Sequence, residues 1–142
     1  MTFLFDGYNY VVRLERGERL SEALLAFIEQ TDLPPGAALS GVGSATEVEL
    51  GFYDLDAKEY IWKKHDNLYE VVSLNGTLAS DPAGKPMFHA HGSFSDRNYQ
   101  VIGGHVKDFV VGATCELFVH RTIRPLTRMY DVDTGLNVLD VS

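Results

Sequence analysis

Three of the five histidines of this 142-residue chain lie in one segment, HAHGSFSDRNYQVIGGH, at residues 89–105. One residue separates His89 from His91, so in a β-strand both side chains point to the same face, with their backbones about 6.5 Å apart. Two imidazoles held in this way can share one cation. Imidazole nitrogens are common ligands of zinc, nickel, copper and iron. The pair therefore predicts one part of a metal site.

A third ligand is predicted from the turn inside this segment. The polar residues SDRN, around Asp96–Asn98, separate two apolar stretches, a pattern typical of a β-hairpin. Folding back about the turn brings His105 near His89, and the preceding glycines, Gly103 and Gly104, permit a bulge or a close backbone approach. Three histidines with an open fourth position describe an exchangeable or catalytic zinc site. The alternative interpretation is a solvated hairpin face that is rich in histidine.

Other reactive side chains give weaker predictions. His65 in KKHD and His120 before an arginine favour surface positions. Cys115 lies in an apolar stretch and is interpreted as a core residue. Ser44 in GVGSA belongs to no complete nucleophile motif, and the segment lacks the lysine of a phosphate loop. Metal-assisted catalysis would need a general acid or base nearby. Composition alone offers four glutamates for that role: Glu47, Glu49, Glu70 and Glu116.

One helix is predicted ahead of most of these residues. Its apolar residues recur at helical spacing and share one face, which is interpreted as core packing. They are Leu20, Ala23, Leu24, Phe27 and Ile28. Pro34, Pro35 and Gly36 are expected to end the helix.

The rest of the chain is typical of strands. Alternation over 8–14 predicts one strand before the helix, and ALSGVG and TEVELGFYD after it are expected to be separated by a turn near Ser44. KEYIWK, LYEVVSLNGTLAS, the two halves of the hairpin and GATCELFVHRTI follow. The last segment, YDVDTGLNVLDV, is expected to add an edge strand or a partner contact. Few helices interrupt the strands, so the sequence predicts an α+β domain with a mostly antiparallel sheet and one main packed helix.

Aromatic residues cluster in the second and third predicted strands after the helix. Phe52, Tyr53, Tyr60 and Trp62 could line a pocket, but aromatic residues in strands are more often core or interface, which is the default interpretation here.

Several segments, in this order and spacing, resemble the plant and prokaryote conserved domain, called PCC or PPC. They are GVGSATEVELGFYD, LYEVVSLNGTLAS, HAHGSFSD, VIGGHV and ATCELFV. The resemblance covers about residues 8–123 of a single domain at 1–142, with a C-terminal extension at 124–142. It implies the α+β fold, assembly as a homotrimer, and a metal, commonly zinc, on the HxH and GGH histidines. Those are His89, His91 and His105 here.

Plant members of that family carry AT-hook motifs and a GRFEIL segment used in partner contacts. This sequence has no RGRP-type AT-hook. The stretch that matches GRFEIL is NLYEVV at 67–72, where only Glu70 is identical and Asn67 replaces a glycine. The plant partner contacts are therefore not expected for this chain.

The charge balance constrains the remaining partners. Twenty acidic and 12 basic side chains give a formal net charge of −8, which disfavours phosphate backbones and anionic membranes. Arg121, Arg124 and Arg128 form a small cluster that is interpreted as a solvated edge or an ion-pairing surface. The single cysteine, the lack of a signal peptide and the lack of an apolar run of about eighteen residues favour a cytoplasmic protein.

We therefore expect a small cytoplasmic homotrimer that binds a divalent metal, zinc first among the candidates, through His89, His91 and His105. Binding or transformation of a small molecule at that metal is the expected role, and whether the protein is an enzyme stays open. The alternative function is that of a DNA-binding or DNA-associated regulatory protein, as the family's common name suggests.

Overall fold

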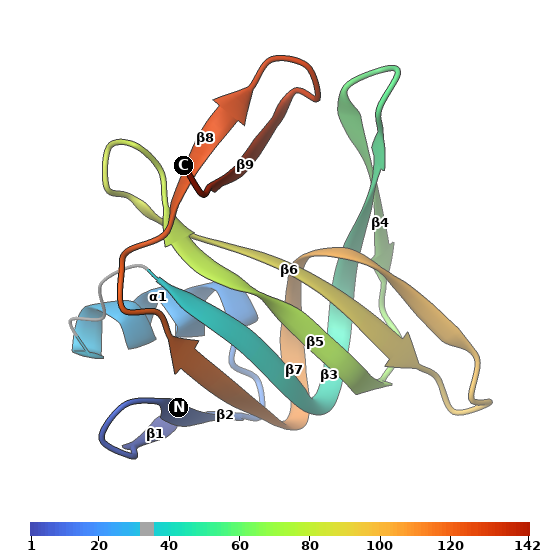
Figure 1. Cartoon of the computed structure of the whole chain (residues 1–142). Helices are drawn as coiled ribbons and strands as arrows, with labels where there is room; N and C mark the ends of the chain where they lie inside the picture. The colour runs from blue at the N-terminus through green and yellow to red at the C-terminus, as the bar shows by residue number, and fades with distance from the viewer. Residues whose placement is uncertain (32–35) are drawn as a thin grey trace.

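The computed structural model describes residues 1–31 and 36–142, and within them the chain forms one helix and nine strands (Figure 1). In chain order these are β1 (Thr2–Phe5), β2 (Tyr10–Glu15), α1 (Leu20–Thr31), β3 (Ala37–Asp54), β4 (Glu59–His65), β5 (Tyr69–Ser80), β6 (Pro86–Ser95), β7 (Val101–Arg121), β8 (Thr127–Asp131) and β9 (Leu136–Asp140). The predicted α+β fold, with mostly antiparallel strands and one packed helix, is confirmed.

Four long strands form the frame that carries the histidines. β3 pairs with both β5 and β7, and β6 also pairs with both β5 and β7, so that these antiparallel pairings close into a circuit. β1, β2 and β4 extend this frame at its edges, and β8 makes a short parallel contact with the end of β5. Figure 1 shows that the β8–β9 hairpin and the β3–β4 hairpin rise from the same side of the frame.

The expected turn near Ser44 is wrong. β3 continues from Ala37 to Asp54, and its register against its neighbours shifts at bulges on both sides of Gly43. Extra residues at bulges bend a strand and let it change partners along its length. A Cβ on Gly43 would lie 2.6 Å from the Cα of Cys115, so this glycine serves close packing within the protomer.

Two further differences concern strand lengths. The stretches NYQVIGGHV and GATCELFVHRTI, expected as separate strands, belong to a single strand, β7. The last segment, expected as an edge strand or a partner contact, holds the end of β8 and all of β9, which pair as a hairpin. β1, which pairs with β2, is not predicted by the sequence.

Among the described residues, no helix is both long enough and apolar enough to cross a membrane.

The helix begins under a carboxylate from a distant strand. Asp108 of β7 accepts hydrogen bonds from the backbone nitrogen and the hydroxyl of Ser21, at 3.0 and 2.7 Å. A negative charge there satisfies free amide groups and complements the helix dipole. The whole predicted apolar face is buried. The helix ends at Thr31, and the prolines expected to end it, Pro34 and Pro35, lie outside the described residues.

Large apolar side chains fill the space between the helix and the curved strands. Phe27, Phe94 and Phe109 are among the largest that are fully buried. Cys115 is buried with them, as predicted, and burial raises the pKa of its thiol to about 12. A thiol with that pKa stays protonated at neutral pH and is a poor nucleophile.

Candidate metal centre and the adjoining cavity

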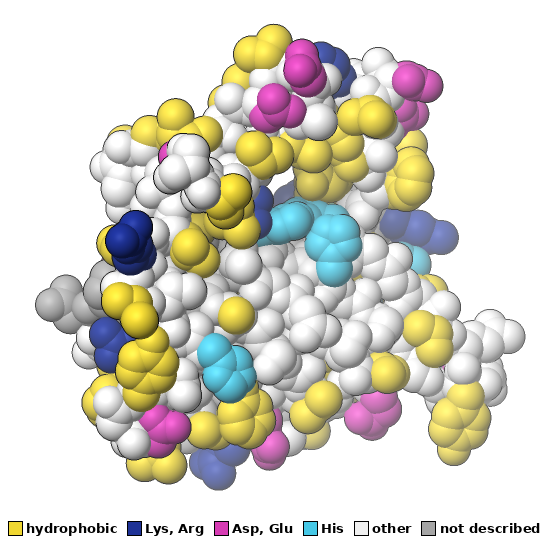
Figure 2. Space-filling view, in the orientation of Figure 1, with side chains coloured by type: hydrophobic (Ala, Val, Ile, Leu, Met, Phe, Trp, Pro, Cys, Tyr) yellow, Lys and Arg dark blue, Asp and Glu magenta, His cyan; other side chains and the backbone are white. Residues whose placement is uncertain are grey.

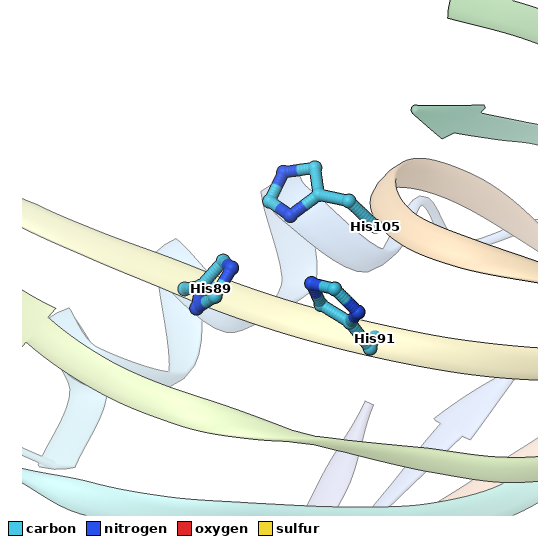
Figure 3. A group of neighbouring side chains, drawn as sticks. All are labelled: His89, His91 and His105. Atoms are coloured by element: carbon cyan, nitrogen blue, oxygen red, sulfur yellow. The ribbon is translucent and has the colours of Figure 1, made fainter. Parts of the chain in front are cut away.

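Strand pairing brings the three predicted histidines together. His91 of β6 lies opposite His105 of β7, and His89 shares the face of His91 two residues earlier on β6. The ring centroids are 4.9 Å apart for His89 and His105, 5.1 Å for His89 and His91, and 5.5 Å for His91 and His105. Figure 3 shows the three rings converging on one space. The expected proximity of His105 to the HxH pair is present.

The nitrogens of these rings lie close together. One nitrogen from each of the three rings lies within 4.8 Å of the other two. Tetrahedral nitrogen ligands at about 2.0–2.1 Å from zinc lie roughly 3.4 Å apart, so the rings would have to move closer together to hold zinc. Nδ1 of His105 is buried and has no hydrogen-bond partner among the described residues. A buried ring nitrogen left without a partner is costly, and a cation would satisfy it in the tautomer that leaves Nδ1 unprotonated.

Burial keeps two of the three rings neutral. Burial is the main cause of the lowered pKa of His89, which is about 4, and the charges of Arg128 and His91 lower it further. The pKa of His105 is also lowered to about 4, first by burial and then by the neighbouring histidines and Arg128. At neutral pH both rings therefore keep the free lone pair that metal coordination requires.

Glycines next to the centre let three strands approach closely. A Cβ on Gly103 would lie 2.8 Å from the carbonyl oxygen of Gly92, and one on Gly104 would lie 3.0 Å from that of Gly51. Side chains would thus force β3, β6 and β7 apart beside His105. Of the two predicted alternatives, a bulge or a close approach, the structure has the close approach, and the register of β6 against β7 has no shift.

Arg128 of β8 also faces the histidines, and its interpretation as a solvated residue is wrong. Its side chain is only 7% exposed. Nη2 lies 3.0 Å from Nδ1 of His89 and 3.1 Å from the hydroxyl of Thr77, and Nη1 donates to the carbonyl of Asn137 at 2.9 Å. Nε is buried without a hydrogen-bond partner in the described part of the chain. The sequence gives little sign of this, because arginine in a short polar strand is ordinarily exposed.

A cavity of about 290 Å³ opens beside His89 and His105. It is lined by Tyr60, Met87, Phe88, His89, His105, Arg128, Leu136, Asn137 and Val138. Figure 2 shows histidine side chains at a recess below the β8–β9 hairpin. Its polar groups are histidine, arginine, asparagine and tyrosine, and none of the described residues that line it is an aspartate or a glutamate. A larger hollow of about 550 Å³, between the start of β5 and the β6–β7 turn, contains no histidine.

Tyr60 lines the cavity, and Trp62 packs against Tyr60. The ring centroid of Tyr60 is 4.8 Å from that of His105, and Tyr60 stacks on Trp62 at 4.7 Å. Burial raises the pKa of the Tyr60 hydroxyl. The pocket interpretation, which the sequence left second to core packing, therefore holds for Tyr60, whereas Phe52 is 71% exposed.

The other candidate residues lie away from this centre. Glu49 pairs with Lys107 at 2.8 Å and Glu47 pairs with Arg19 at 3.2 Å. Four more candidates are placed by exposure or contact: Glu70, Glu116 and His120 are exposed, and His65 contacts the ring of Tyr69 edge-on. None of these candidates lines the cavity beside the histidines.

Comparison with known proteins supports the fold and links it to named relatives. The model of the Plants and Prokaryotes Conserved (PCC) domain family matches residues 3–123. A structure from Ralstonia eutropha JMP134, provisionally named a DNA-binding protein, has a TM-score of 0.89 at 30% identity and covers 99% of this chain and 96% of its own. No curated protein gave a significant match to the sequence.

Two archaeal structures are similar over nearly their full length. A plant- and prokaryote-conserved protein from Pyrococcus horikoshii has a TM-score of 0.85 at 26% identity, covering 98% of this chain and 94% of its own. A protein from Archaeoglobus fulgidus described as metal-containing has a TM-score of 0.84 at 27% identity, covering 98% of each chain.

Proposed function

The chain belongs to the Plants and Prokaryotes Conserved (PCC) domain family, and we propose that it is a metal-binding member in which His89, His91 and His105 hold one divalent cation. The observation that carries the proposal is the convergence of three imidazole nitrogens within 4.8 Å. The buried, unpartnered Nδ1 of His105 in the described structure supports it, as does the metal-containing relative of the same fold from Archaeoglobus fulgidus.

Zinc is the cation that we propose for this centre. Three neutral imidazoles suit zinc with one position left open, and nickel, copper and iron are the competitors for such ligands. When bound, the cation would act as a Lewis acid toward an oxygen of a small ligand. The residues of the chain determine access, because His91 is exposed while His89 and His105 border the cavity. The proposed role is therefore to bind, or to transform, a small molecule.

Elemental mass spectrometry tests the metal proposal directly. The native chain, purified without a polyhistidine tag, is dialysed after addition of zinc and compared with the His89→Ala/His91→Ala double variant. We expect about one zinc per native chain and little in the variant. His120→Ala is the matched control, because it removes an exposed histidine outside the cluster. Equal metal content in the native protein and the double variant would refute the proposal, and so would a metal-free native protein.

We also propose that the chain assembles as a homotrimer, as the family resemblance implies. An apolar patch on neighbouring strands supports an interface: Val42 of β3, Val72 of β5 and Phe118 of β7 are each about half exposed and border one shallow hollow. Light scattering should give three times the 15.8-kDa mass of the chain. A mass equal to one chain at micromolar concentration would contradict assembly.

DNA association is a second candidate, favoured by the name of the Ralstonia eutropha structure. The net charge of −8 opposes it. Fluorescence anisotropy with a duplex at several salt concentrations separates the two functions. The net charge predicts no appreciable binding at physiological salt. Binding that weakens with salt and survives replacement of the histidines would favour the DNA function instead.

A further inference from the structure

We propose that the cavity beside the histidines binds a small monocarboxylate with a short apolar tail, and that Arg128 recognises the carboxylate. This inference names the ligand class of the proposed metal centre and rests on that proposal only for the position of the cation. It starts from Arg128, Tyr60 and the β8–β9 hairpin, which the metal proposal does not use.

Arg128 is a buried cation without an anion. Its side chain is 7% exposed, and within residues 1–31 and 36–142 it forms no ion pair with an aspartate or a glutamate. Its partners are uncharged oxygens of Thr77 and Asn137 and a ring nitrogen of His89. Buried charges are ordinarily paired because their desolvation is expensive. The missing anion is therefore expected to come from a ligand.

The guanidinium also has a donor to offer that ligand. Nε of Arg128 is buried and has no partner in the part of the chain that the structure describes. Arg128 is itself one of the residues that line the cavity. A carboxylate binds arginine through two parallel hydrogen bonds, which match the fork of the guanidinium. No described protein group occupies Nε, so an anion entering the cavity could use this donor after a small shift of the guanidinium.

Cation binding at His89 would free a second donor. A guanidinium only donates hydrogen bonds, so its contact with Nδ1 of His89 requires that nitrogen to accept. If the cation binds Nδ1, the lone pair is no longer available to Arg128. If the cation binds Nε2, the proton of the neutral ring moves to Nδ1, which then cannot accept. In both cases Nη2 of Arg128 loses this partner and becomes available to a carboxylate, so the two ligands should help each other to bind.

The remaining walls define the rest of the ligand. Apolar side chains of Met87, Phe88, Leu136 and Val138 line the cavity, together with the ring of Tyr60. The volume of about 290 Å³ lies just below the range of roughly 300–1,000 Å³ for ligand pockets, which suits a small ligand. A lining that combines these apolar side chains with the polar groups of Arg128, Asn137 and the histidines fits a short amphipathic acid better than inorganic phosphate.

The C-terminal hairpin supplies much of this wall. Arg128, Leu136, Asn137 and Val138 lie beyond residue 123, where the family match ends. The hairpin is tied to the β3–β4 hairpin by hydrogen bonds, from the Tyr53 hydroxyl to the carbonyl of Thr134 at 2.7 Å and from Lys58 to that of Val132 at 2.8 Å. Recognition of the ligand is thus built on a segment beyond the residues that the family model matches.

Isothermal titration calorimetry with butyrate and its neutral analogue butyramide tests the inference. The two probes have the same shape and differ in charge. We expect butyrate to bind the native protein and butyramide to bind at least tenfold more weakly, because charge-assisted hydrogen bonds are lost. Arg128→Gln should weaken butyrate by roughly ten- to a hundredfold. The exposed Arg124 provides the control Arg124→Gln, which should leave the affinity unchanged.

Metal-free and zinc-loaded protein, with metal content measured for each variant, separate this inference from the metal proposal. If zinc binds and butyrate binds neither form, the inference fails and the metal proposal stands. If zinc does not bind but butyrate binds through Arg128, the reverse holds. Equal affinity for butyrate and butyramide, or tighter binding of inorganic phosphate, overturns the inference. If Arg128→Gln does not fold, the comparison of the two probes on the native protein decides.

Discussion

Two clusters of charged and polar side chains in this molecule differ in how completely their partners are supplied by the chain. At the start of α1, Arg19 lies 3.2 Å from Glu47 and 3.5 Å from Asp108, and Asp108 also accepts two hydrogen bonds from Ser21. The guanidinium of Arg19 is paired with both carboxylates, and the carboxylate of Asp108 also caps the start of the helix. This cluster needs no ligand, and its role is to hold the helix on β7.

At the histidine centre the partners are incomplete. The two buried side-chain atoms without a hydrogen-bond partner in the described structure are Nδ1 of His105 and Nε of Arg128, and both residues line the same cavity. Native proteins rarely leave such atoms unpaired without a ligand or a function. A buried polar cluster is therefore a candidate binding site when some of its hydrogen-bond donors and acceptors have no partner within the chain.

The largest expected effect comes from removing a histidine of the centre. His105→Ala should lower zinc affinity by more than about 100-fold, because even loss of a partner of a metal ligand costs 10- to 100-fold. Competition with a chromophoric chelator measures the change. His120→Ala, outside the cluster, should bind zinc like the native chain. Equal zinc affinities for the two variants would show that His105 is not a ligand of the cation.

Acid should destabilise the metal-free protein through the same residues. The pKa of His89 and of His105 is lowered from 6.5 to about 4 in the folded state. Between these values the unfolded chain takes up protons that the folded chain does not, so the free energy of unfolding falls as the pH falls from 6.5 toward 4. Urea unfolding at several pH values should show this slope, and His105→Asn should reduce it. An unchanged slope in the variant would contradict the burial of the ring.

A smaller effect is expected at the satisfied cluster. Asp108→Ala removes the carboxylate above α1 and should lower the free energy of unfolding by about 1–2 kcal/mol, the usual cost of losing a helix cap. Thermal or urea unfolding measures it. Zinc content should stay at the native value, since Asp108 does not line the cavity. Loss of zinc in a folded Asp108→Ala protein would show that the two clusters are coupled.

The smallest effect is expected at a solvated ion pair. Arg13 and Glu15 lie 2.9 Å apart, but both side chains are about half exposed. Arg13→Ala should change the free energy of unfolding by less than about 1 kcal/mol. A larger loss in urea unfolding would mean that exposure is a poor guide to which polar contacts matter in this protein.

Local patterns predicted most of the elements and the histidine centre. The apolar face of α1 follows from helical spacing, and the meeting of His89, His91 and His105 follows from the period of a strand and one hairpin turn. Both depend on neighbours in sequence, where periodicity is informative. The resemblance to the PCC family added the association of these histidines with a metal, which spacing alone left open.

Long-range packing decided what the sequence did not reveal. The bulges around Gly43 replace a turn near Ser44 because β3 changes partners there, and a strand that bends resembles two strands in local pattern. Arg128 reaches His89 across 39 positions of sequence through the folding back of the last hairpin. No local periodicity marks such a residue, and only the assembled cavity distinguishes it from the exposed Arg124.

X-ray absorption at the zinc edge, on the untagged zinc-loaded chain, tests the central claim most directly. The account predicts a first coordination sphere of nitrogen or oxygen at about 2.0–2.1 Å, with multiple-scattering features of three imidazoles. In His105→Ala those features should fall to the number for two rings or disappear with the metal. A spectrum with fewer than three imidazoles in the native protein, or one unchanged by His105→Ala, would contradict the three-histidine centre.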